Sequence, residues 1–349
     1  MAPRTKILLR TALSFLLAGV FLYIAFRGTN FNDLLASLRD LRYWWIALLI
    51  PVGLSSHYVR ALRWKYMLGH VKETWSVRNL FAAVMIGYMV NNALPRVGEL
   101  VRPYVAGRLE GISKSTALGS VVVERIIDTV ALVAIVCLIL FVSPATLSAF
   151  VEDAENLRPF FLAGSVVSLV LLTLLFLKSE SVVRSAKGLV VLVPARSRDR
   201  VHRLFDSFAS GFRVSTMKEE FWRIGALSVI MWGLYALGLY LPFLAYPSLD
   251  AAGLDMAAAV VLLAVSSVAF VLPAPGAFGT YHSFMKYALM RLYGVDEVTA
   301  LSYTIVTHEL NVLTTTVVGA WFFLKDHLRV SDVAAEAERQ ANSDGGESA

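Results

Sequence analysis

The chain has 349 residues, of which 57% are hydrophobic and 17% charged, and its formal net charge is +6. Soluble globular domains are about 45–50% apolar, and the apolar residues here form long blocks, which excludes an ordinary soluble domain and indicates a polytopic membrane protein. The basic excess lies between the blocks, so it indicates membrane orientation rather than a nucleic-acid partner. The single cysteine, Cys137, excludes an intramolecular disulfide.

Eight apolar blocks follow one another along the chain. Most of them approach or exceed the roughly 20 apolar residues that a helix needs to cross a bilayer. The first block has a basic start but a poor cleavage site, which favours an uncleaved span over a signal peptide. The blocks lie at 7–26, 43–58, 80–94, 117–142, 160–177, 224–246, 251–272 and 299–324.

The loop charges predict the topology, because basic loops face the cytoplasm. The segment after the second block, which includes Arg60 and Arg63, and the segment 178–223 are both basic. These two basic segments fall on the same side of the membrane only if 80–108 is a re-entrant hairpin. A second re-entrant hairpin at 251–293 then places the C-terminus in the cytoplasm, on the same side as the N-terminus. We therefore predict an all-α integral membrane protein with about six full spans and two re-entrant hairpins in an inverted repeat. Eight full spans is the alternative.

The predicted membrane domain covers 1–328, with its first half at 1–177 and its second half at 223–328. An amphipathic cytoplasmic connector is predicted between them, at 178–222. Its apolar residues follow a helical period, which favours a helix on the membrane surface over a helix that covers loop ends. The polar tail at 329–349 is predicted to be disordered.

The pattern Leu-Pro-x-x-Gly occurs twice, at Leu94–Gly98 and Leu272–Gly276, and each copy interrupts an apolar block. Proline breaks a helix, and in lipid a broken helix is tolerated only where protein or a water-filled cavity satisfies its backbone. Matching breaks in two halves of a membrane protein point to a transporter's binding site. The predicted hairpin tips are Pro95, Gly98, Pro273, Pro275, Gly276 and Gly279.

Charged residues inside membrane segments are costly, so they indicate function. Arg96 and Arg102 carry planar, permanently charged guanidinium groups, which suit phosphate oxygens, so the segment is interpreted as a binding site. The alternative interpretation is a basic loop that rests on anionic lipid. In the next span, Glu124 and Asp128 share one helix face. We expect them to meet Arg96 or Arg102, although an ion-pair lock that only fixes register is the competing interpretation. The predicted substrate-binding residues are Asn91, Asn92, Arg96, Glu99, Arg102, Glu124, Arg125 and Asp128.

The second half carries a smaller polar group. His282, His308 and Glu309 are candidates for proton coupling, because histidine titrates near neutral pH; the alternative is hydrogen-bonded packing. The sequence has no metal-type Cys/His spacing and no hydrolase, ATPase or phosphate-loop motif. We therefore expect no metal, no cofactor and no enzymatic activity.

Three motifs carry a family resemblance. The motifs are Asn91-Asn92-Ala-Leu-Pro95-Arg96-Val-Gly98-Glu99-Leu-Val-Arg102, Val123-Glu124-Arg125-Ile-Ile-Asp128 and Pro273-Ala-Pro275-Gly276-Ala-Phe-Gly279-Thr-Tyr. With them, the chain resembles the lysylphosphatidylglycerol synthase transmembrane (flippase-like) family over nearly its whole length. In the full-length synthases this membrane domain moves aminoacylated phosphatidylglycerol between leaflets, so the resemblance implies that Arg96, Glu99, Arg102, Glu124, Arg125 and Asp128 belong to a headgroup site.

The chain departs from the family in two ways. Ala277 and His282 stand where many relatives have glycine and glutamate, and the chain stops soon after its last span, so we expect no lysyl transfer. We predict a lipid translocase of the inner (plasma) membrane that moves a phosphate-headgroup or polyprenyl-linked lipid, with anionic membrane lipids and a lipid-modifying enzyme as candidate partners. The alternatives are a membrane enzyme or accessory subunit that uses Glu99 or Asp128 as acid–base groups, and a scaffold that anchors a synthase.

Overall fold

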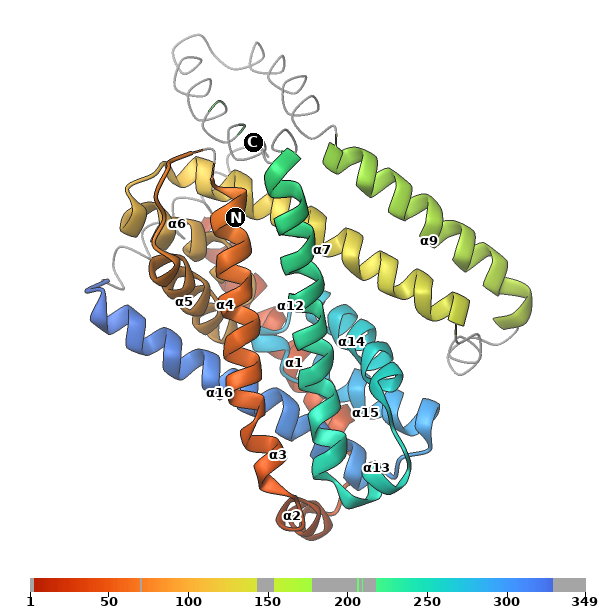
Figure 1. Cartoon of the computed structure of the whole chain (residues 1–349). Helices are drawn as coiled ribbons and strands as arrows, with labels where there is room; N and C mark the ends of the chain where they lie inside the picture. The colour runs from red at the N-terminus through yellow and green to blue at the C-terminus, as the bar shows by residue number, and fades with distance from the viewer. Residues whose placement is uncertain are drawn as a thin grey trace.

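The computed structural model describes residues 3–69, 71–142, 154–177 and 218–328, together with 206 and 209. Every regular element in these ranges is a helix (Figure 1). The predicted all-α membrane-type fold is therefore confirmed. Most of the predicted connector at 178–222 and the whole predicted tail at 329–349 lie outside the described residues.

The helices form one bundle in which α4 packs on α12 at the centre and α9 lies at the edge against α7 (Figure 1). The first half contains α1 (Pro3–Phe26), α2 (Phe31–Arg39), α3 (Tyr43–Ala47), α4 (Leu49–Met67), α5 (Val77–Ala93), α6 (Gly98–Glu110), α7 (Lys114–Val142) and α9 (Ala154–Leu177). The second half contains α12 (Lys218–Ala245), α13 (Pro247–Ala251), α14 (Met256–Val271), the 3-10 turn η3 (Pro275–Ala277), α15 (Thr280–Tyr293) and α16 (Glu297–Lys325).

Among the described residues, four helical segments are long and apolar enough to cross a membrane. A fifth is obtained if α1 and α2, which meet at 81°, count as one span. Helix α16 is as long as α7, with 29 residues, but it carries His308, Glu309 and Asn311 among its apolar residues. The predicted count of six full spans therefore stays a prediction.

The contacts between helices recur in the same order in the two halves. Helix α4 packs on α5, α5 on α6 and α6 on α7, while α12 packs on α14, α14 on α15 and α15 on α16. Between the halves, α5 packs on α16 and α14 packs on α7. If α4, α5, α6 and α7 are matched in that order with α12, α14, α15 and α16, each of these contacts in one half has its counterpart in the other half.

The same local signals start and end both pairs of broken helices. Ser76 caps the N-terminus of α5 and Asp255 caps that of α14, each with a side-chain oxygen that accepts a backbone N–H of the first turn. Gly111 and Gly294 end α6 and α15 in the left-handed conformation, with φ of 69° and 64°. Between these signals, both Leu-Pro-x-x-Gly segments break the helix where the sequence predicts.

The first broken pair folds back on itself. The amide N–H of Gly98 donates to Oδ1 of Asn91 at 2.7 Å near the tip, and Nδ2 of Asn79 donates to Oε1 of Glu110 at 2.8 Å at the other end. Helices α5 and α6 are therefore antiparallel. In the second pair, the rings of Phe270 and Tyr281 are 5.7 Å apart across the break.

Helix α16 shows how the two hairpins are placed relative to one another. Helix α5 runs along the C-terminal half of α16, and α15 runs along its N-terminal half. The two hairpins therefore enter the bundle from opposite ends, and their tips meet near the middle of α16. From the end of α16 to its start, the contacts are Arg78–Asp326 at 2.7 Å, Asn92–Thr315 at 3.1 Å, Tyr281–Thr307 at 3.1 Å and Lys286–Glu297 at 2.6 Å.

The two ends of the bundle differ in charge. One end, here named the basic end, holds the outer ends of α4, α5, α6, α12 and α16, since Lys72 pairs with Glu110 and Arg78 with Asp326. The opposite end holds α2 and α13 (Figure 1). At the basic end, Lys65, Lys72, Arg78, Arg108, Arg223 and Lys325 outnumber Glu73, Glu110, Glu220 and Asp326. The opposite end carries Asp33, Asp40, Asp250, Asp255, Asp296 and Glu297 together with Arg27, Arg39, Arg42, Lys286 and Arg291, and so has no basic excess.

The close packing of the first hairpin gives a testable prediction. A Cβ atom at position 98 would lie 1.9 Å from the backbone oxygen of Gly87 and 2.7 Å from the side chain of Asn91. Overpacking costs about 1–3 kcal/mol, and a backbone obstacle cannot rotate away, so we expect Gly98→Ala to lower the thermal unfolding midpoint in detergent. Gly233→Ala lies inside α12, where a Cβ meets nothing within 4 Å and alanine favours the helix, so it should not lower the midpoint. Equal midpoints for both variants would contradict this packing.

Candidate functional site

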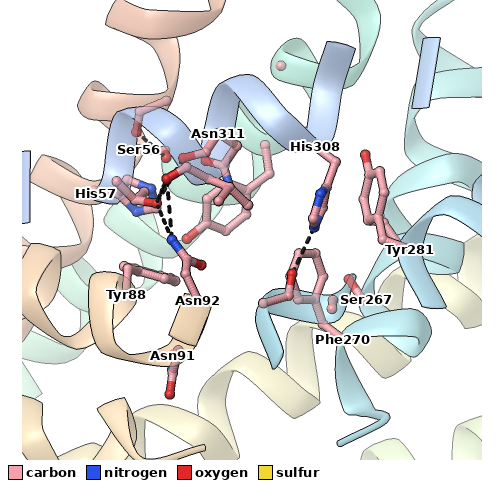
Figure 2. A pocket seen from close by; sticks show the side chains of 18 of the residues that line it. Ser56, His57, Tyr88, Asn91, Asn92, Ser267, Phe270, Tyr281, His308 and Asn311 are labelled. Atoms are coloured by element: carbon pink, nitrogen blue, oxygen red, sulfur yellow. Dashed lines mark hydrogen bonds between the residues drawn. The ribbon is translucent and has the colours of Figure 1, made fainter. Parts of the chain in front are cut away.

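A cavity of about 570 Å³ lies where the two hairpin tips meet (Figure 2). Its walls come from α4, α5, α6, α7, α12, α14, α15 and α16 and from both breaks. Apolar side chains such as Leu132, Leu263 and Phe270 line part of it. The predicted site and tip residues that line the cavity are Asn91, Asn92, Pro95, Arg96, Glu99, Arg125, Asp128, Pro273, Gly276 and His308.

Two predicted binding residues, Arg102 and Glu124, lie behind the cavity wall. Glu124 is fully buried and Arg102 is 5% exposed, and Nη2 of Arg102 is 2.8 Å from Oε2 of Glu124. The Arg102 guanidinium also lies over the Trp64 ring, 4.0 Å from its centroid. The expected contact between the hairpin and the charged span is therefore present, but it belongs to the packed interior.

Two arginines of α4 complete this interior cluster. Arg60 reaches Oε1 of Glu124 and Oδ2 of Asp128, both at 2.5 Å. Arg63 is 2.7 Å from Oδ1 of Asp128 and 3.2 Å from Oε1 of Glu124. Arg60 also donates to the hydroxyl groups of Tyr88 and Tyr235.

The prediction that Arg60 and Arg63 belong to a cytoplasmic loop is wrong. Helix α4 continues to Met67 and buries both side chains, because the carboxylates of Glu124 and Asp128 on α7 compensate their charges. One sequence signal could have found them. His57, Arg60 and Arg63 are spaced three residues apart, so they share one helix face.

Arg125 and Arg96 differ from the buried arginines. The Arg125 side chain is 44% exposed, and its guanidinium is 3.5–3.7 Å from oxygens of Glu99, Glu124 and Asp128, beyond ordinary hydrogen-bond distance. Nη2 of Arg96 donates to the backbone oxygen of Val271 at 2.8 Å, which joins the first tip to the end of α14. Both guanidinium groups line the cavity and keep donors for a further acceptor.

The charges around the cavity do not cancel. Among the described residues, five arginines (Arg60, Arg63, Arg96, Arg102 and Arg125) lie in or next to the cavity together with four carboxylates (Glu99, Glu124, Asp128 and Glu309). A net positive charge in a cavity with low-dielectric walls attracts anions, because the walls concentrate the field of the charges. The arrangement favours a ligand with negative charge.

The two asparagines satisfy backbone and side-chain groups near the breaks. Oδ1 of Asn91 accepts the amide N–H of Gly98, the first residue of α6, as expected for a broken helix. Nδ2 of Asn92 donates to the backbone oxygen of Val312 and to the hydroxyl of Thr315, at 3.3 and 3.1 Å (Figure 2). Asn92 therefore ties the first hairpin to α16.

The predicted proton-coupling residues lie together beside the second break. Nδ1 of His308 is 3.0 Å, and Nε2 of His282 is 3.2 Å, from Oε1 of Glu309. Nε2 of His308 is 2.8 Å from the backbone oxygen of Gly276 (Figure 2). The geometry brings the three side chains together, and their role in proton transfer stays a prediction.

Comparison with known proteins places the chain in a family. A family model described as the lysylphosphatidylglycerol synthase TM region matches residues 8–319. The UPF0104 membrane protein MJ1595 of Methanocaldococcus jannaschii is 34% identical over 87 residues, a match that spans 24% of this chain and 24% of that relative. No solved structure was found to match the chain. Because the family model covers most of its length, the chain belongs to the lysylphosphatidylglycerol synthase transmembrane family.

Proposed function

We propose that this protein moves lipids with an anionic, phosphate-bearing headgroup between the two leaflets of its membrane. The observation that carries the proposal is that Arg96 and Arg125 line one cavity with guanidinium donors left for a ligand. A guanidinium fork matches two oxygens of a phosphate group. Family membership, which is associated with membrane lipids, supports the same class of ligand.

The buried cluster would serve as scaffold for this headgroup site. Glu124 and Asp128 neutralise Arg60, Arg63 and Arg102 at distances of 2.5–3.2 Å. Those three arginines are therefore occupied, and the charge that remains for a ligand lies on Arg96 and Arg125. The predicted contribution of Arg102 and Glu124 to the headgroup site would then be indirect, through the position of α6 and α7.

In this proposal, movement of lipid between leaflets depends on two structural repeats of inverted topology. The first repeat is α4–α7 and the second is α12–α16. The recurring order of contacts supports this repeat, as do the two hairpins that enter from opposite ends of α16. Inverted repeats allow a central site to open to each side in turn, by rocking of one repeat against the other. In this arrangement each hairpin is re-entrant, and the tips at Pro95 and Pro273 meet near the membrane midplane.

The charge of the two ends supports an orientation. Basic residues near membrane segments are retained in the cytoplasm, so the basic end, with the C-terminus of α16, would face the cytoplasm. Lys286 on α15 donates to the backbone oxygen of Ala25 near the end of α1. This contact supports an orientation in which α1 ends on the other side, so that the N-terminus would lie in the cytoplasm too.

The contacts of Asp128 argue against the enzyme alternative. Arg60 and Arg63 approach its two oxygens at 2.5 and 2.7 Å, so both oxygens already have partners within the protein. A general acid or base needs an oxygen within hydrogen-bond reach of the substrate. Glu99 lies 3.7 Å from Arg125 and lines the cavity, where it would hold that arginine in place.

A transport assay tests the proposal. The full chain is reconstituted into liposomes with trace fluorescent phosphatidylglycerol, polyprenyl phosphate or phosphatidylcholine, and a membrane-impermeant quencher reports how fast inner-leaflet lipid becomes accessible. We expect faster exposure of one or both phosphate-bearing anionic lipids than of zwitterionic phosphatidylcholine, and the two anionic arms identify which kind is moved. The Arg96→Gln, Arg125→Gln double variant should lose this exposure. Failure of the folded wild-type protein to move either anionic lipid, or a covalent change of the lipid seen by mass spectrometry, would contradict the proposal.

A further inference from the structure

A second cluster of polar side chains lies beside the cavity and takes no part in the arginine site. His282 on α15 and His308 and Glu309 on α16 each offer one ligand atom, and these atoms lie within 4.8 Å of one another. Both imidazole side chains are buried, with 2% and 1% exposure, whereas the Glu309 side chain is 42% exposed. The cluster is therefore enclosed by protein and still accessible to a small ion.

The hydrogen bond of His308 decides what its other ring nitrogen can do. Its Nε2 atom is 2.8 Å from the backbone oxygen of Gly276, which can only accept, so Nε2 carries the hydrogen. The neutral ring then presents the Nδ1 lone pair to Oε1 of Glu309 at 3.0 Å. Two acceptors that face each other repel, and a cation between them removes the repulsion.

We propose that His282, His308 and Glu309 bind a divalent transition-metal ion of the zinc class. Two histidines and one glutamate are a known zinc ligand set, and with Zn–N distances near 2.0–2.1 Å the neighbouring ligand atoms of a tetrahedral site are roughly 3.3 Å apart. The distances from Oε1 of Glu309 to the two ring nitrogens, 3.0 and 3.2 Å, are close to that value. The three ligand atoms lie within 4.8 Å of one another, and binding of the ion would draw the two ring nitrogens to the same spacing. One ion accounts for all three convergent ligands, whereas a proton bridges only two atoms.

The surroundings of His308 support the same assignment. Histidines that bind metal commonly donate their second ring N–H to a backbone oxygen, which fixes the tautomer and the direction of the lone pair. His308 makes this contact with Gly276, at the second hairpin tip. A bound ion would therefore join α15 to α16 and brace the tip. The two histidines lie on different helices, which explains why no metal-binding sequence motif indicates the site.

Metal binding is measurable without any transport, so this inference does not rest on the proposed function. The full chain, purified in detergent without a histidine tag, is equilibrated with Zn²⁺ and its metal content is measured by mass spectrometry. We expect about one Zn²⁺ per chain, and Co²⁺ in its place should give the absorption bands of a tetrahedral site. Zn²⁺ should also raise the thermal unfolding midpoint, because an ion that binds only the folded state stabilises it.

Matched variants locate the site. His308→Gln and Glu309→Gln should each weaken Zn²⁺ binding by more than about tenfold, whereas His57→Gln, which changes another buried histidine on α4, should bind as the wild type does. Glu309→Gln is nearly isosteric and its side chain is partly exposed, so it tests the site even if His308→Gln folds poorly. A wild-type protein that takes up no Zn²⁺ or Co²⁺, which would leave only a shared proton, overturns the proposal. Binding that persists unchanged in Glu309→Gln overturns it too.

Discussion

Replacing Glu124 with glutamine is expected to destabilise the protein by about 3–5 kcal/mol. Glu124 is fully buried, and its carboxylate is within 3.2 Å of guanidinium groups of Arg60, Arg63 and Arg102. The amide keeps the shape but removes the charge, so Arg102 would lose the carboxylate that it contacts, and Arg60 and Arg63 would keep only that of Asp128. Removing one partner of a buried ion cluster is costly, because the remaining charges cannot return to water. The measurement is the unfolding midpoint of the purified protein in detergent.

An exposed ion pair provides the control for this variant. Asp250 is 2.6 Å from Arg42, but both side chains are well exposed, at 39% and 52%. Exposed pairs contribute about 0–1 kcal/mol, so Asp250→Asn should leave the midpoint nearly unchanged. If Glu124→Gln unfolds at the same temperature as Asp250→Asn, the buried cluster is not the scaffold that we describe.

Replacing Arg125 with glutamine is expected to leave the fold intact and to weaken the binding of anionic lipid by roughly 10- to 100-fold. Its guanidinium is 44% exposed and makes no carboxylate contact closer than 3.5 Å, so the folded protein loses little. A hydrogen bond to a charged group contributes about 1.5–3 kcal/mol, which corresponds to that change in affinity. The measurement is binding of fluorescent phosphatidylglycerol to the detergent-solubilised protein, with the unfolding midpoint recorded in parallel.

Two further variants make this result specific. Arg125→Lys keeps the charge but not the planar fork, so it should recover only part of the affinity. Arg291→Gln removes an exposed arginine of α15 that contacts Tyr287, and it should bind lipid as the wild type does. Equal losses in Arg125→Gln and Arg291→Gln would mean that only the overall charge matters and that the cavity is not the binding site.

The sequence alone was sufficient to predict where the two helices break and which charged residues of α6 and α7 belong to the site. Proline and glycine act on their own backbone, so Pro95 and Pro273 could be identified as break points from local chemistry. The charges of Glu124 and Asp128 stood out against an apolar span, and i to i+4 spacing placed them on one face. The contact of Glu124 with Arg102 follows from the short distance in sequence between the hairpin and α7.

Other features depend on contacts between distant segments and could not be predicted. Arg60 and Arg63 look like loop residues until α7 supplies carboxylates that compensate them, 64 residues away in the case of Arg60 and Glu124. Arg60, Arg63 and Arg102 are closely paired with carboxylates, although Arg60 also lines the cavity, whereas Arg96 and Arg125 keep donors for a ligand. This difference likewise depends on contacts with distant segments. The convergence of His282 with His308 is set by the packing of α15 on α16, which no spacing rule reveals.

The most direct test of the central claim is an electron cryomicroscopy structure of the full chain in nanodiscs of phosphatidylglycerol, the anionic lipid of the binding assay. We expect headgroup density in the cavity between the two hairpin tips, with phosphate oxygens within hydrogen-bond distance of Arg96 and Arg125. Phosphatidylglycerol bound with its headgroup outside the cavity, or only acyl-chain density between the tips, would contradict the account.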